Sequence, residues 1–223
     1  MIVLLVLGAC EPSAADRALA ASRAADLPTA LAACPEGDGA CQMEAVVRFG
    51  EWARCGEVLD PWDDECRFRQ AEAVERDDRG GEALELCAST VYVIGCATHV
   101  VGQQARREHT AADADARWER LRPHTEDRYA YPYWRGFWRA GIDRGDAPAL
   151  ERCIGALCRD AGLKEIEATV HALRVPCRAA DRPPPGWIPA DSMASTAAWV
   201  EALRHHCVPD AEHPVPEPLR APR

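Results

Sequence analysis

The feature that most restricts how this chain can fold is its set of 11 cysteines within 223 residues. Such a density is typical of exported proteins, whose cysteines pair as disulfides in an oxidising compartment. No Cys-x-x-Cys pair and no Cys/His spacing of a zinc site occurs, which disfavours metal binding. Setting Cys10 aside leaves an even set of ten, which we expect to form five disulfides: Cys34, Cys41, Cys55, Cys66, Cys87, Cys96, Cys153, Cys158, Cys177 and Cys207.

A repeated pattern, Ala-Leu-x-x-Cys, indicates where the cross-links lie. It occurs at residues 30–34, 83–87 and 149–153, and a second cysteine follows after six, eight and four further residues. A turn with an aspartate precedes each copy, and aspartate is a favoured N-cap because it accepts hydrogen bonds from the first amides of a helix. We therefore expect a helix, a cysteine, a short loop and a second cysteine that opens the next helix. The predicted N-cap residues are Asp26, Asp78 and Asp146.

The order of the cysteines favours sequential pairing, although sequence alone leaves the connectivity open. The predicted local pairs are Cys34 with Cys41, Cys55 with Cys66, and Cys87 with Cys96. Cys177 and Cys207 then remain as a longer-range pair. Cys153 and Cys158 would lie about 7.5 Å apart along a continuous helix and on different faces, which is beyond the reach of a disulfide. Either the helix breaks at Gly155 or these two cysteines have other partners.

The composition favours an all-α fold. Ala, Leu, Glu and Arg fill the long segments and favour helix, while the main β-branched run covers only residues 91–94. The copies of the pattern begin 53 and 66 residues apart, so the chain is not a solenoid of fixed period. We predict an irregular array of disulfide-stapled αα-hairpins over residues 26–207, with a candidate subdivision near residues 110–128. A proline-rich tail over residues 208–223 follows.

The N-terminal residues are expected to form an export signal. The first seven residues are apolar but too few to cross a bilayer, which takes about 20 residues, so residues 1–9 are predicted to be a signal peptide. The run leads into Leu7-Gly8-Ala9-Cys10, which resembles the lipobox of bacterial lipoproteins. The resemblance implies that Cys10 is acylated and begins a lipidated tether over residues 10–25. No Lys or Arg precedes the run, and a start codon further upstream would explain this; the alternative is a buried N-terminal helix with a free cysteine.

The stapled hairpins over residues 26–160 resemble those of exported tetratricopeptide-like proteins and of cysteine-rich lipoproteins of proteobacteria. This resemblance implies a protein of the bacterial cell envelope, and it brings no catalytic residues with it. Glu11, which follows the lipobox cysteine, implies an outer-membrane lipoprotein that faces the periplasm or the cell surface. The formal net charge of −10 disfavours nucleic acid as a partner. The expected partners are the membrane, through the lipid anchor, and another protein.

An aromatic segment is the strongest candidate for a binding surface. Residues 129–138 hold six of the 14 aromatic side chains, interleaved with arginines. We expect most of them in the core, because one stripe repeats at helical spacing; its members are Trp134, Phe137, Trp138 and Gly141. The alternative is a partly exposed recognition surface, since Tyr, Trp and Arg dominate binding hot spots. The candidate surface residues are Tyr131, Tyr133 and Arg135, of which Tyr131 and Arg135 are expected to be exposed beside buried Trp134 and Trp138.

No linear motif indicates catalysis. The sequence lacks the motifs of serine hydrolases, zinc proteases, phosphate-binding loops and haem attachment. His205 and His206 are adjacent on a predicted helix and point about 100° apart, so both rarely reach one metal ion. We therefore predict a cell-envelope lipoprotein that acts as a non-catalytic binding or structural module, with no cofactor and no metal. The alternative is an envelope enzyme whose site is assembled from scattered His, Asp and Glu side chains.

Overall fold

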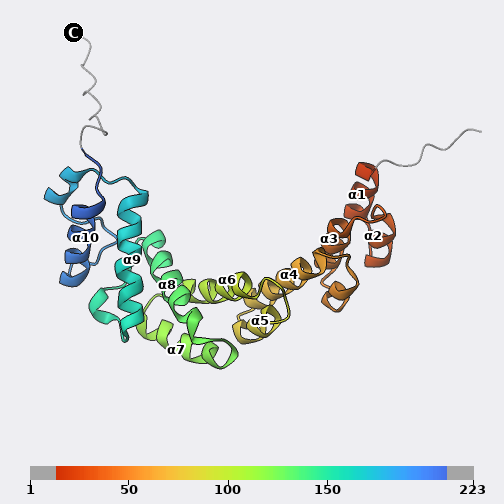
Figure 1. Cartoon of the computed structure of the whole chain (residues 1–223), viewed down its shortest axis with the longest axis horizontal. Helices are drawn as coiled ribbons and strands as arrows, with labels where there is room; N and C mark the ends of the chain where they lie inside the picture. The colour runs from red at the N-terminus through yellow and green to blue at the C-terminus, as the bar shows by residue number, and fades with distance from the viewer. Residues whose placement is uncertain (1–13, 210–223) are drawn as a thin grey trace, which may run out of the picture. The chain divides into compact units, whose positions relative to one another are not determined.

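The computed structural model describes residues 14–209, and within them the chain is helical (Figure 1). Ten α-helices and five short 3-10 helices occur in this range, and the β-structure in it is a single bridge between Pro176 and Val208. The predicted all-α class is confirmed. None of the described helices is both long and apolar enough to cross a membrane. Cys10, the predicted signal peptide and the predicted tail beyond residue 209 lie outside the described residues.

The chain divides into two compact units, Met1–Cys96 and Ala97–Arg223, and the boundary falls within α6 (Val93–Arg106). Within unit 1, α4 packs against both α3 and α5. The core of this unit consists of small aliphatic side chains and cystines; its most buried members are Ala30, Met43, Val46, Cys55 and Cys66. The helices of unit 1 are α1 (Ala14–Arg23), α2 (Leu27–Ala33), α3 (Gly39–Phe49), α4 (Trp62–Arg76) and α5 (Gly80–Cys87).

Helix α1 occupies part of the segment over residues 10–25 that was predicted to be a lipidated tether. The alanine-rich sequence of this segment has high helix propensity, and Ala21 and Ala24 are buried. Arg48 of α3 holds the end of α1, because its guanidinium donates hydrogen bonds to the carbonyl oxygens of Ala21, Ser22 and Ala24 at 3.1, 2.5 and 2.8 Å. The carbonyl of Ala21 also accepts from the amide of Ala24, and Arg48 adds a side-chain donor at this helix C-terminus, where carbonyl groups lack intrahelical partners.

One of the three predicted N-caps is confirmed and two are wrong. Asp26 caps α2 and accepts a hydrogen bond from the amide of Thr29 at 2.8 Å. Asp78 and Asp146 instead lie just after the ends of α4 and α8 (Ala130–Arg144), where the chain closes the finished helix. The amide after Asp78 donates to the Val74 carbonyl five residues back, and the amide of Asp146 donates to Gly141 in the same way. Both hydrogen bonds satisfy a carbonyl group in the last turn of a helix, as in a C-cap motif.

The predicted break at Gly155 explains the shortest disulfide loop. Gly155 is extended and precedes α9 (Ala156–Ala172), so Cys153 and Cys158 do not share a helix, and their Cα atoms are 5.5 Å apart. The Ala-Leu copy before it forms a 3-10 turn, Leu150–Arg152, in place of the predicted α-helix. All five sequential pairs are confirmed, namely Cys34–Cys41, Cys55–Cys66, Cys87–Cys96, Cys153–Cys158 and Cys177–Cys207.

The Cys177–Cys207 disulfide closes the longest loop, and backbone hydrogen bonds accompany it. The amide of Cys177 donates to the carbonyl of Val208 at 3.0 Å, and the amide of Val208 donates to that of Val175 at 2.9 Å. Cys207 directly follows α10 (Met193–His206), so the end of this helix is fixed beside the segment that follows α9.

Unit 2 is built around the aromatic stripe, as predicted. Helix α9 packs against both α8 and α10, and α7 (Ala111–Leu121) contacts α8. Trp134, Phe137 and Trp138 are all buried in this core. The indole nitrogen of Trp138 donates to the carbonyl of Cys158 at 2.8 Å, which satisfies its one polar atom. Gly162 of α9 lies against the Trp138 ring so closely that no side chain would fit there.

Tyr133 was predicted to belong to the binding surface, and this is wrong because its side chain is completely buried. Its hydroxyl donates to the carbonyl of Ala114 on α7 at 2.7 Å. Its ring centroid lies 5.2 Å from that of Trp118 and 5.5 Å from that of Trp134. Burial raises the pKa of the Tyr133 phenol well above its usual value. The buried face of α8 is therefore wider than the predicted stripe, because α7 supplies an acceptor for the hydroxyl.

Candidate functional site

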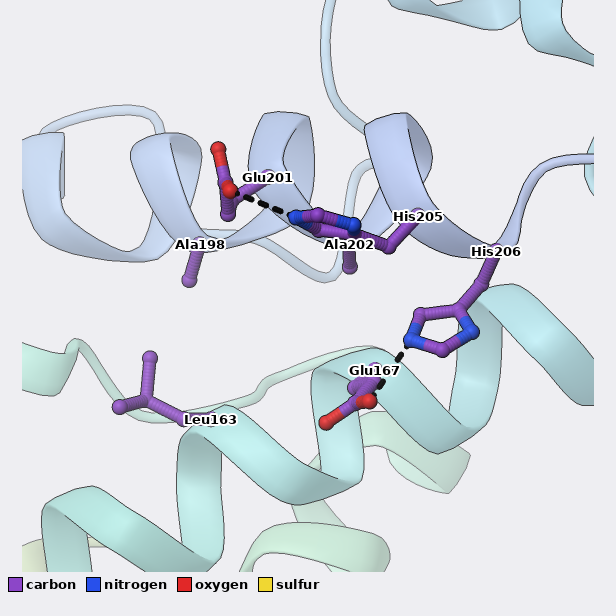
Figure 2. Close-up of a pocket in the computed structure, with 7 residues that line it drawn as sticks. All are labelled: Leu163, Glu167, Ala198, Glu201, Ala202, His205 and His206. Carbon is purple, nitrogen blue, oxygen red and sulfur yellow. Dashed lines mark hydrogen bonds and ion pairs between the residues drawn. The ribbon is translucent and has the colours of Figure 1, made fainter.

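Three surface hollows of unit 2 adjoin one another along α9. The central hollow, of about 500 Å³, lies between α9 and α10 (Figure 2). A neighbouring hollow continues it toward Arg159 and Arg204, past small side chains of α10 such as Ala194 and Ala197. The central hollow is lined by Leu163, Glu167, Ala198, Glu201, Ala202, His205 and His206.

Two histidine–glutamate pairs line the central hollow. His205 lies one turn after Glu201 on α10, and their Nε2 and Oε1 atoms are 2.9 Å apart. His206 reaches across to α9, where its Nε2 lies 2.7 Å from Oε1 of Glu167 (Figure 2). Both histidines lie in the last turn of α10, where the helix dipole favours positive charge. The arrangement links the two helices through a polar contact at the surface.

Both carboxylates of the hollow are held in the ionised form. The hydrogen bond from Lys164, followed by that from His206, lowers the pKa of Glu167. His205 and Arg204 lower the pKa of Glu201 in the same way. The hydrogen bond to Glu167 in turn raises the pKa of Lys164. A carboxylate with a lowered pKa is a poor general acid near neutral pH, so these groups are suited to holding charge.

A third hollow, of about 360 Å³, opens on the other side of α9, and we call it the basic pocket. It shares Glu167 and His206 with the central hollow. Here the structure brings the sequence-predicted Tyr131 and Arg135 of α8 together with residues that the sequence did not single out. The basic pocket is lined by Tyr131, Arg135, Lys164, Glu167, Ala168, His171 and His206.

The side chain of Arg135 is exposed at the rim of the basic pocket, and its guanidinium is held by a buried carboxylate. Half of the Arg135 side chain is accessible to solvent, as predicted. Tyr131, which was also predicted to be exposed, is instead partly buried. The Nε and Nη2 atoms of Arg135 lie 2.5 Å from Oε1 of Glu165, which is almost wholly buried. Arg139 approaches the second oxygen of Glu165 at 3.7 Å. A buried carboxylate requires such compensation, so Glu165 fixes the position of Arg135 in the pocket wall.

The imidazoles do not assemble a metal site. The rings of His171 and His206 are nearly perpendicular with centroids 6.2 Å apart. Cys207, next to His206, is bonded to Cys177. Within residues 14–209 no group of three or more His, Cys, Asp or Glu side chains is arranged to hold a metal ion.

Sequence reasoning missed Lys164, Glu167 and His171. A signal was present, because Glu167–His171 and Glu201–His205 both have the four-residue spacing that places two side chains on one helix face. What brings the two pairs together is the packing of α10 on α9, and the sequence does not encode that in any local pattern.

Unit 1 has a separate hollow of about 450 Å³ between α1 and α3, and it is lined by Ala21, Ser22, Asp38, Ala40, Cys41, Glu44, Ala45 and Arg48. Two of its charged members, Asp38 and Arg48, are engaged in the fold itself. Asp38 caps α3 by accepting from the amide of Cys41, and Arg48 closes the end of α1. We therefore regard the basic pocket of unit 2 as the candidate site.

Comparison of this chain with protein-family models, curated proteins and solved structures finds no match. The function must therefore be argued from the chemistry of its own residues.

Proposed function

We propose that this protein is a lipid-anchored, non-catalytic binding module of the bacterial cell envelope, which holds its ligand in the basic pocket of unit 2. The observation that carries the binding role is the convergence of Tyr131, Arg135, Lys164 and two histidines on one hollow. The side chains come from three helices whose packing is set by buried aromatics and by a disulfide. Such preformed polar groups are what a small-molecule site needs.

Export is supported by the cysteines. All ten cysteines of the described residues are paired, and disulfides of this kind persist in oxidising, extracytoplasmic compartments. The resemblance of residues 7–10 to a lipobox supports the further proposal of an acylated Cys10. A lipoprotein cysteine carries several acyl chains, which together hold a protein stably on a membrane.

Binding is favoured over catalysis by the pairing of the charged groups. The residues that line the basic pocket include no Ser, Thr or Cys nucleophile, and its one carboxylate, Glu167, is paired with Lys164 and His206. One observation supports an envelope enzyme as second candidate, namely that Glu167 could orient His206 as a general base. Turnover of a substrate that is abolished by His206→Gln would establish that candidate.

Intact-mass measurement of the protein purified from membranes tests the proposed export and anchoring. We expect added lipid on Cys10, and a gain of two hydrogen atoms for each of the five disulfides upon reduction. Cys10→Ser should move the protein out of the membrane fraction, whereas the neighbouring Glu11→Gln should leave the lipid in place. A Cys10→Ser protein that stays in the membrane fraction, together with a wild-type mass without lipid, would refute the anchor.

A further inference from the structure

The basic pocket contrasts in charge with the rest of the protein. The chain has a formal net charge of −10, yet two cations, Arg135 and Lys164, line this hollow beside a single carboxylate, Glu167. The remaining polar lining groups are the Tyr131 hydroxyl and two imidazoles. The two cations, the phenol hydroxyl and the imidazoles can all donate a hydrogen bond. A ligand that accepts hydrogen bonds and carries negative charge fits such a set.

Glu167 already behaves as an anion bound at the edge of this pocket. Its Oε1 atom lies 2.7 Å from Nε2 of His206, and its Oε2 atom accepts from Nζ of Lys164 at 2.8 Å. About a third of the Glu167 side chain is exposed, and Lys164 is more exposed still. Exposed pairs of this kind are weak, so a second oxyanion can compete for the same two donors at little cost.

The rest of the pocket is suited to recognising more than a bare ion. Arg135 is held in place by Glu165, so its position costs little entropy on binding. The rings of Tyr131, His171 and His206 supply flat surfaces around the charged centre. A volume of about 360 Å³ lies at the lower end of the range for small-molecule sites.

We propose that the basic pocket binds a small organic oxyanion, bearing a carboxylate or a phosphate, which displaces Glu167 from Lys164 and His206. This inference rests on the proposed function of the pocket as a ligand site and names the class of ligand. It assigns Glu167 the role of an internal competitor: the side chain keeps the donors oriented when the pocket is empty and opposes the ligand when it binds.

Lys164 is the only lysine of the sequence, which makes the pocket accessible to a selective measurement. Acetylation of the full, disulfide-bonded chain, followed by peptide mass spectrometry, reports the reactivity of this one side-chain amine. We expect succinate or inorganic phosphate, titrated at constant ionic strength, to slow acetylation of Lys164 several-fold. Protection by one probe and not by the other identifies the oxyanion. Equal reactivity with and without both probes, up to tens of millimolar, would overturn the inference.

Variants measured by calorimetry sharpen the test. Glu167→Gln should bind the protecting anion several-fold more tightly, because the competitor is gone. Lys164→Met should weaken binding about tenfold, and Lys164→Arg should restore most of it. Arg152→Gln is the matched control, because Arg152 pairs with Asp191 at 3.6 Å and does not line the pocket; its affinity should equal that of the wild type. Weaker anion binding by a folded Glu167→Gln protein would contradict the assigned role of Glu167.

Failure of this inference is distinguishable from failure of the proposed function. If tetramethylammonium, a cation without an acylable amine, changes the reactivity of Lys164 while both anions do not, the pocket is a binding site for a different class of ligand, and only the inference is wrong. If no probe acts and His206→Gln abolishes turnover of a substrate, the non-catalytic role itself is wrong.

Discussion

The two units of this protein stabilise short helices by different means. Residues 1–96 carry 18 acidic and 8 basic side chains and three of the disulfides, whereas residues 97–223 carry 18 of each charge, two disulfides and all seven histidines. The core of unit 1 is made of cystines and small aliphatic side chains. The core of unit 2 is made of large aromatic rings.

The difference shows how each unit meets the entropy cost of folding. Short cross-links lower the entropy of the unfolded chain, so the disulfides of unit 1 supplement its core of smaller apolar side chains. Large rings bury much apolar surface per residue, which leaves α8 and α9 of unit 2 free to expose polar side chains on their outer faces. The unit with the aromatic core is also the unit with the candidate site, and the predictions below test whether the two kinds of stabilisation are separable.

The largest expected effect is that of Trp138→Ala. The side chain is wholly buried and its indole nitrogen is hydrogen-bonded, so the variant should lose about 3–5 kcal/mol of stability through cavity formation. Hydrogen exchange, analysed separately for each unit, should show the loss mainly in unit 2. Trp62→Ala is the control in unit 1, because Trp62 is 39% exposed. A melting temperature that Trp138→Ala leaves unchanged would contradict the role of the aromatic core.

Removal of a disulfide from unit 1 should destabilise mainly unit 1. The Cys55–Cys66 cross-link lies in the core of unit 1 and closes a loop of 11 residues, so the Cys55→Ser/Cys66→Ser double variant should lose about 3 kcal/mol. Denaturant unfolding measures the loss, and hydrogen exchange should place it in unit 1. Greater exchange in unit 2 than in unit 1 would show that the units are not independently stabilised.

Arg135→Ala tests the wall of the basic pocket. The variant leaves buried Glu165 with the more distant Arg139 alone, so we expect a loss of about 1–3 kcal/mol. Tyr131→Ala, on the same face, should change stability by less than about 0.5 kcal/mol. Combining Arg135→Ala with Glu165→Gln should recover part of the loss in a thermal melt. An additive double variant would mean that the pair is not coupled.

Acid should weaken unit 2 slightly more than unit 1. Hydrogen bonds lower the pKa of Asp146, Glu151, Glu167 and Glu201 in unit 2, while in the described part of unit 1 only Asp26 shows such a shift. A lowered folded-state pKa adds stability above the usual carboxyl range, which is lost as the pH falls through the folded value. These groups are mostly exposed, so the effect is small.

Unit-resolved hydrogen exchange between pH 6 and pH 3, corrected for intrinsic rates, measures this difference. Glu201→Gln should slightly reduce the loss of protection that unit 2 shows between pH 6 and pH 3, because one of its carboxyl groups with a lowered pKa is then absent. Identical acid responses in the two units would contradict the prediction.

The sequence predicted well what depends on local chemistry. The order of the cysteines, the break at Gly155 and the helical spacing of Trp134, Phe137 and Trp138 are all properties of neighbouring residues, and all were confirmed. The same local chemistry failed at Asp78, because an aspartate between two helices can serve the end of one or the start of the other.

What the sequence did not predict depends on packing between distant segments. Tyr133 is buried because α7 offers it an acceptor 19 residues away. Glu167 and His206 meet because α10 returns to pack on α9. On α8, the candidate pocket was anticipated at Arg135, which is exposed, and at Tyr131, which is partly buried.

The Cys177–Cys207 disulfide turns the end of the protein into a covalent ring. The ring contains the exposed, proline-rich segment near Arg182 and the whole of α10. An endoprotease that cuts this segment produces two peptides but does not release α10 from α9, because the disulfide still joins them. The nick becomes visible on a gel only after reduction. Cleavage in this segment therefore leaves the side chains that line the basic pocket in place.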